Sequence, residues 1–148
     1  TSTLQVLFRR DLEKLKLEVS QYQHEQNLWK TDGNIINSAG NLCLHLVGNL
    51  NHFIGTILGS TGYVRQRERE FSDKNVPRQE LLRMVEETMT VVEQSLGKVS
   101  DKQLQKAYPI EVFGYPMTTE YFLIHLAMHL DYHLGQINYH RRLLDINE

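Results

Sequence analysis

Histidines recur at every fourth position near the end of the chain. His125, His129 and His133 follow one another at that spacing, and Gln136 and His140 continue the series. On an α-helix, which turns about 100° per residue, all of them fall within about 40° of the direction of His129. Two imidazoles four residues apart on one helix point their nitrogens at a common centre and can bind a divalent metal ion. Zinc is the default ion, and nickel, iron and manganese are alternatives because imidazole suits most of them.

This histidine stripe is expected to face the core of the protein, because core-forming residues bracket it: Phe122, Leu126, Ile137 and Leu144. An unpaired polar group costs on the order of 1–3 kcal/mol to bury, so several imidazoles in a row need a shared partner. A metal ion is one such partner. Hydrogen bonds within a purely structural helix bundle are another, and the spacing alone neither decides between them nor singles out one pair of histidines.

A second feature lies between Gly33 and Val64, a stretch without Asp, Glu, Lys or Arg. Its helical pattern places an uncharged polar face beside the apolar one: Asn41, His45, Asn49 and His52. A face exposed to bulk water normally carries charges. We therefore expect this face to pack against a partner or to line a polar cavity, and His45 can reach a neighbouring helix from it. Three other histidines are expected to be surface or hydrogen-bonded residues rather than ligands: His24, His52 and His140.

Four helices are expected to position these side chains. Apolar residues recur at spacings of three and four in each of them: residues 4–22, 38–59, 77–97 and 118–144. Ser38 and Thr118 are the expected N-caps, and Pro77 suits a first helical turn. No convincing alternating strand is present, so the sequence predicts an all-α fold, a four-helix bundle. The connections over residues 60–76 and 98–117 are long enough for a crossover, so a simple up-down-up-down order is not assumed.

The composition is that of an ordinary soluble domain. Residues 1–148 fit a single domain, and their formal net charge of −2 includes no basic block that would favour nucleic acid as a partner. The one basic cluster is expected to be a solvated loop rather than an anion site, because acidic residues are interleaved with it: Arg65, Arg67, Glu68, Arg69 and Glu70.

The cellular location is predicted from features that the sequence lacks: a disulfide, a signal peptide and a membrane span. Its single cysteine, Cys43, excludes an internal disulfide and fits a reducing cytoplasm. Charged residues stand early in the chain, at Arg9, Arg10 and Asp11, where a signal peptide would have its apolar run. No segment is expected to reach the ~20 apolar residues of a membrane span. The sequence therefore predicts a cytoplasmic protein without a membrane partner.

Two motifs resemble those of a known family: Leu44-His45-Leu46 in the apolar second helix, and His129-Leu-Asp-Tyr-His133-Leu-Gly-Gln136 in the fourth. Together they resemble the DinB/YfiT-like superfamily of bacterial metalloenzymes. The resemblance covers essentially the whole chain, including the helix lengths and the long connections. The motif of the fourth helix is fairly specific, whereas that of the second helix is weak by itself.

The resemblance implies a particular site and a particular topology. It makes His45, His129 and His133 the metal ligands and leaves His125 as their neighbour, a choice that spacing could not make. It also implies a bundle with helix order 1-2-4-3 and a homodimer. Members commonly carry an arginine directly after the last ligand, where this sequence has Leu134. Any role of that arginine is therefore absent here.

Three neutral imidazoles would leave a divalent ion with its full charge and an open position. That is the pattern of a catalytic metal site, since structural zinc sites are usually closed by four protein ligands. Such an ion activates a bound water or thiol, which would be the catalytic group. Three side chains are candidates to orient the imidazoles from behind: Asn49, His125 and Gln136.

The histidine stripe carries no Glu or Asp that could act as a general base, which disfavours a His-Glu-x-x-His peptidase. Relatives implied by the resemblance include thiol S-transferases and isomerases that use a low-molecular-weight thiol. The leading hypothesis is a metal-dependent transferase that joins such a thiol to a small electrophile. The alternatives are a metal-hydroxide hydrolase of a small-molecule substrate and a non-catalytic metal- or ligand-binding bundle.

Overall fold

The structure, a computed structural model, describes residues 1–147 and is built from helices. Within that range the only β-type pairings are two isolated bridges, Asp32 with Ile35 and Ala107 with Thr118. The predicted all-α class is therefore confirmed.

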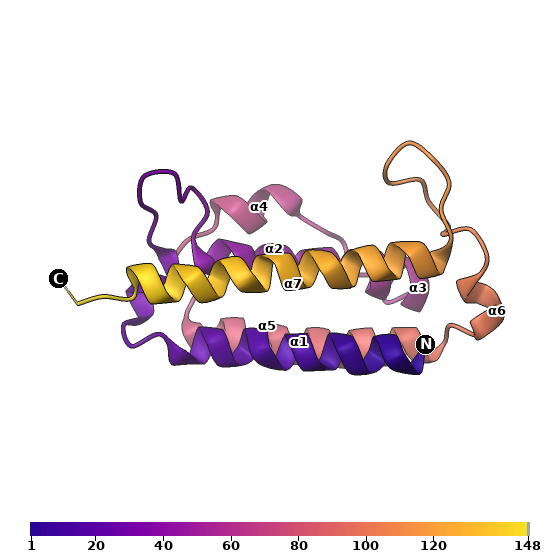
Figure 1. Cartoon of the computed structure of the whole chain (residues 1–148), viewed down its shortest axis with the longest axis horizontal. Helices are drawn as coiled ribbons and strands as arrows, with labels where there is room; N and C mark the ends of the chain where they lie inside the picture. Colours follow the sequence, from indigo (N-terminus) through magenta and orange to yellow (C-terminus); the bar gives the residue numbers. More distant parts are fainter. Residues whose placement is uncertain (148) are drawn as a thin grey trace.

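Four long helical segments make up the body of the molecule (Figure 1): α1 Ser2–Gln21, α2 Ala39–Leu50 with its continuation, α5 Arg78–Gly97 and α7 Thr119–Leu144. The second segment continues without a break through a π-helical stretch, Asn51–Thr56, into α3, Ile57–Gly59. The four predicted helices match these segments to within a few residues. The π-helical stretch was not predicted.

Side-chain caps fix where two of these helices begin. Ser38 Oγ accepts a hydrogen bond from the amide of Asn41, and Thr118 Oγ1 accepts one from the amide of Tyr121. Each satisfies a backbone donor that the first helical turn leaves free. Both predicted N-caps are therefore confirmed. Pro77 differs slightly from expectation, because it is the N-cap of α5 and lies just before the first turn.

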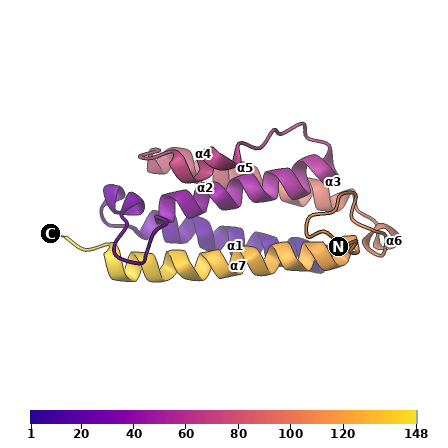
Figure 2. The same ribbon diagram turned by 90° about the horizontal axis from the view of Figure 1, so that it is seen from above.

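The long segments pack in a ring, in the order α1, α5, α2, α7. α1 lies against α5 and α7, and α2 lies against the same two helices on the other side, with few direct contacts between α1 and α2 (Figures 1 and 2). The expected helix order 1-2-4-3 is not confirmed by these contacts. α1 and α7 run in one direction and α2 and α5 in the other, so α2 and α5 are parallel neighbours. The predicted crossover is present.

Three short helices occupy the connections. A 3₁₀-helix, Glu25–Trp29, lies between α1 and α2. The return from α3 to α5 contains α4, Arg67–Ser72, which packs on α2 (Figure 2). α6, Asp101–Leu104, follows α5 and starts with a capping box in which Ser100 and Gln103 satisfy each other's backbone amides.

The second helical segment forms much of the core. Ala39–Gly59 is long and apolar enough to cross a membrane, contrary to the expectation that no segment reaches that length. However, 67% of its most apolar stretch is buried inside the protein. Leu46, Leu50 and Ile54 have no exposed surface. The apolar character of this segment therefore fits a helix that packs in the protein core.

Candidate metal centre

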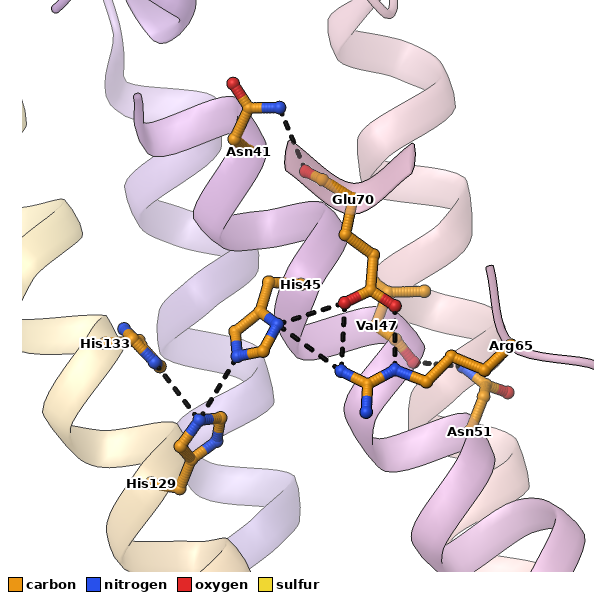
Figure 3. Close-up of polar contacts among 8 residues, drawn as sticks. All are labelled: Asn41, His45, Val47, Asn51, Arg65, Glu70, His129 and His133. Atoms are coloured by element: carbon orange, nitrogen blue, oxygen red, sulfur yellow. Dashed lines mark hydrogen bonds and ion pairs between the residues drawn. The ribbon is translucent and has the colours of Figure 1, made fainter. Parts of the chain in front are cut away.

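Three histidines from two helices meet between α2 and α7. The Nε2 atom of His129 lies 3.2 Å from Nε2 of His45 and 3.1 Å from Nε2 of His133 (Figure 3). One ligand atom from each of the three residues lies within 4.8 Å of the other two. The sequence predicted this set, and the structure brings all three together.

The spacing of the three nitrogens fits a metal ion. Metal–nitrogen bonds of 2.0–2.1 Å at a tetrahedral angle separate two ligand nitrogens by about 3.3 Å. The two Nε2–Nε2 distances from His129, 3.2 and 3.1 Å, are close to that value. This group could therefore hold a metal ion without a large movement of the helices.

The helix packing explains the convergence. His129 and His133 are one turn apart on α7, so they project from the same face. α2 crosses that face in the antiparallel direction and presents His45 to it. His45 is only 6% exposed, whereas His129 and His133 each keep part of their surface in contact with solvent. The centre is therefore buried on the α2 side and reachable from the α7 side.

Hydrogen bonds at the far side of two rings determine which nitrogens carry protons. Nδ1 of His45 lies 3.0 Å from Oε1 of Glu70, and Nδ1 of His133 lies 2.7 Å from Oε1 of Gln136. A carboxylate and an amide oxygen can only accept, so both Nδ1 atoms donate. The Nε2 atoms of His45 and His133 then carry lone pairs, and both face Nε2 of His129. One proton on His129 could not satisfy both, whereas a cation among the three nitrogens would.

Burial keeps the imidazoles of His129 and His133 neutral. It lowers the pKa of His129 to about 4, with further lowering by the neighbouring His133 and His45. Burial likewise lowers the pKa of His133, although the hydrogen bond to Gln136 works in the opposite direction. At neutral pH both side chains are therefore unprotonated, which is the form that binds a metal ion.

Glu70 and Arg65 form an ion pair behind His45 that sequence reasoning missed. Nε of Arg65 donates to Oε2 of Glu70 and Nη2 to Oε1, each at 2.9 Å. Glu70 is 6% exposed and lies in helix α4, so the expectation of a solvated loop over this cluster is wrong at Glu70 and Arg65. Arg67, Glu68 and Arg69 are exposed, as expected. Burial raises the pKa of Glu70, but the hydrogen bonds from His45 and Arg65 outweigh it and the pKa lies below its usual value.

The three residues expected to orient the ligands have different positions. Gln136 contacts His133, as described above. Asn49 is buried on α2, but it makes no hydrogen bond to the three histidines and its Oδ1 has no hydrogen-bond partner among the described residues. His125 stacks on His129 with ring centroids 6.4 Å apart, and its other ring neighbours are aromatic side chains. The structure therefore brings only Gln136 of these three into hydrogen-bonding contact with a ligand.

Two other histidines, His140 and His52, lie outside the centre. Tyr22 Oη donates to Nδ1 of His140 at 2.7 Å, and Nε2 of His140 donates to the carbonyl oxygen of Lys30 at 2.8 Å. The expectation that His140 is a hydrogen-bonded residue is confirmed. His52 packs edge-on against the ring of Phe53 at 4.7 Å. Neither belongs to the three-histidine group.

Comparison with known proteins identifies a family without assigning an activity. The model of a family described as a protein of unknown function (DUF1572) matches residues 3–148. No curated protein matches the sequence.

Proposed function

Because the chain belongs to the DUF1572 family, whose description names no activity, we propose its function from the three-histidine centre: it is a divalent-metal-dependent enzyme, with zinc as the default ion. The convergence of His45, His129 and His133 on one point is the observation that supports this. Within residues 1–147 no fourth His, Cys, Asp or Glu joins that group. Three protein ligands and one open position are typical of a catalytic site.

The reaction that fits best is transfer of a thiol to a small electrophile. A divalent ion held by three neutral imidazoles lowers the pKa of a thiol or water that reaches it and so supplies a nucleophile at neutral pH. In the transfer the thiol sulfur bonds to the electrophilic carbon, the leaving group departs with its electron pair, and the thiol proton passes to solvent. His45, His129 and His133 hold and orient the centre, and Gln136 keeps His133 in the ligating tautomer.

The position of the carboxylate favours a thiol over hydrolysis. Glu70 is the acidic side chain in hydrogen-bonding contact with the centre, and it lies on the Nδ1 side of His45, where both of its oxygens are engaged by His45 and Arg65. It therefore faces away from the Nε2 atoms and cannot serve as a general base there. A thiol needs less help than water, because its pKa is far lower.

The test combines metal-loaded protein with candidate thiols and 1-chloro-2,4-dinitrobenzene, and follows the chromogenic product. We expect thiol-dependent turnover that disappears in His45→Ala and after removal of metal with a chelator. Rates for the wild type equal to those of His45→Ala would refute the proposal. Metal-dependent hydrolysis of an activated ester in the absence of any thiol would instead identify the hydrolase.

We also propose that the protein is a DinB/YfiT-like four-helix bundle that forms homodimers. The placement of the two histidine motifs on α2 and α7 supports the superfamily. Large apolar side chains along the outer side of α7 support self-association, since a row of exposed apolar groups marks an interaction surface: Tyr121, Ile124, Met128, Tyr132, Tyr139 and Leu143.

A further inference from the structure

Gly48 opens a space on α2 that the carboxylate of Glu70 fills. A Cβ atom built on Gly48 would lie 1.9 Å from Oε2 and 2.6 Å from Cδ of Glu70. Both distances are far below any van der Waals contact. The carboxylate therefore occupies the position that a side chain at residue 48 would take. Gly48 lies one turn after His45, so this space is directly beside the imidazole.

Glu70 is held at both ends. Its carbonyl oxygen accepts a hydrogen bond from Nδ2 of Asn41 at 2.9 Å, which ties α4 to the start of α2. Its carboxylate accepts two hydrogen bonds from Arg65 and one from His45 (Figure 3). Such a two-pronged arginine–carboxylate pair has a defined orientation as well as strength. The carboxylate therefore has a defined position beside His45.

We propose that Glu70, admitted by Gly48 and clamped by Arg65, is the positioning residue of the metal centre. It holds the proton of His45 on Nδ1, aims the Nε2 lone pair at His129 and His133, and makes His45 a stronger donor. This inference depends on the metal-binding part of the proposed function and not on the thiol reaction. A carboxylate that accepts a hydrogen bond from the ring nitrogen that does not bind the metal orients the imidazole and raises its basicity.

The role of Arg65 follows from the burial of the carboxylate. Burying a carboxylate costs desolvation free energy, and a single imidazole partner would offset too little of that cost. Nη2 of Arg65 is 3.4 Å from Nδ1 of His45, but both groups carry protons there, so Arg65 acts on His45 through Glu70. Arg65 also limits how much negative charge reaches the metal centre. A bound ion would then keep most of its Lewis acidity while His45 keeps its orientation.

Two variants test this proposal, with a third as a control. Gly48→Ala displaces the carboxylate by crowding. Glu70→Gln keeps the shape and an acceptor oxygen but removes the charge, and it remains informative if Gly48→Ala does not fold. The matched control is Gly55→Ala on the same helical segment, where an added Cβ would lie 2.9 Å from Cγ1 of Val91 and away from the centre.

The affinity for Zn²⁺ is measured by competition with a chelating dye, and the visible spectrum is recorded with Co²⁺. We expect Gly48→Ala to weaken zinc binding about 10- to 100-fold and Glu70→Gln by about 10-fold. Both should change the Co²⁺ spectrum, whereas Gly55→Ala should change only the melting temperature. Zinc affinities of Glu70→Gln and of folded Gly48→Ala within twofold of the wild type would overturn the proposal.

¹⁵N NMR of the imidazole rings in metal-free protein gives a readout that does not depend on metal or turnover. We expect the proton of His45 on Nδ1 in the wild type and an altered proton distribution in Gly48→Ala. A proton on Nε2 of His45 in the wild type would overturn the inference. Loss of zinc affinity in Gly48→Ala and Glu70→Gln without any thiol turnover in the wild type would support this inference while refuting only the proposed reaction.

Discussion

Acidification should destabilise the metal-free protein through His129. Its pKa in the folded protein is about 4, because burial disfavours the imidazolium and neighbouring positive charge adds to the effect. In the unfolded chain the pKa of histidine is about 6.5. Between these two values the unfolded state binds a proton that the folded state does not. The free energy of unfolding therefore falls as the pH drops from about 6.5 towards 4.

The size of the effect follows from those two pKa values. Between pH 7 and pH 5 a full shift from 6.5 to 4 removes about 1.8 kcal/mol of stability. His129 keeps part of its surface in solvent, and solvent screening reduces the value to roughly 1 kcal/mol. His133 and His140 also have pKa values lowered mainly by burial, so they add to the loss in the same direction. Glu70 has a lowered pKa and titrates below this range, so it contributes little.

Urea unfolding of chelator-treated protein at pH 7 and pH 5 measures this loss. We expect the wild type to lose about 1–2 kcal/mol and His129→Gln, which has no titrating ring, to lose about 1 kcal/mol less. The slope of the unfolding free energy against urea should be the same for both proteins, since the surface exposed on unfolding does not change. An equal loss in wild type and His129→Gln would refute the reasoning, as would a gain of stability on acidification.

Metal binding and self-association give three further tests. Zinc at 100 times its dissociation constant should add about 2.7 kcal/mol to the free energy of unfolding and raise the melting temperature by roughly 5–10 °C, and a scan of His133→Ala should show no such rise. Gln136→Leu removes the acceptor of His133 Nδ1 and should weaken zinc binding by about 10-fold; unchanged affinity in a chelator titration would show that Gln136 does not orient this ligand. Met128 is 67% exposed on α7, so Met128→Lys should shift the sedimentation of the protein towards monomer, and an unaltered profile would exclude this face from the dimer.

Spacing along single helices predicted a shared histidine face on the fourth helix, but it did not by itself select the three ligands. The four-residue interval between His129 and His133 implies a shared face, whatever the rest of the chain does. The absence of charge around His45 indicated that this face of α2 is covered, and the structure shows it covered by α7 and α4. The choice of His129 and His133 over His125 needed the resemblance to a family, because all three lie on one stripe.

Glu70 could not be predicted in the same way. Its contact with His45 depends on how residues 60–77 pack, and helical periodicity describes one helix at a time. Arg67 and Glu68, which precede it, are exposed, and the local pattern of charges predicts a solvent-exposed segment. One indirect signal was present at Gly48, because glycine inside a helix costs about 1 kcal/mol relative to alanine. A glycine in the middle of a buried helix therefore points to the close approach of another group.

The topology and the carboxylate are connected. Since α2 and α5 run in the same direction, the chain must return along the length of the helices between Gly59 and Arg78. That return carries α4 across α2 at the level of His45, where Gly48 leaves room for Glu70. A short hairpin between α2 and α5 would make them antiparallel and leave no segment there. A bundle of that kind would need the acidic partner of His45 on one of its long helices. Here Glu70 lies instead on α4, in the crossover connection.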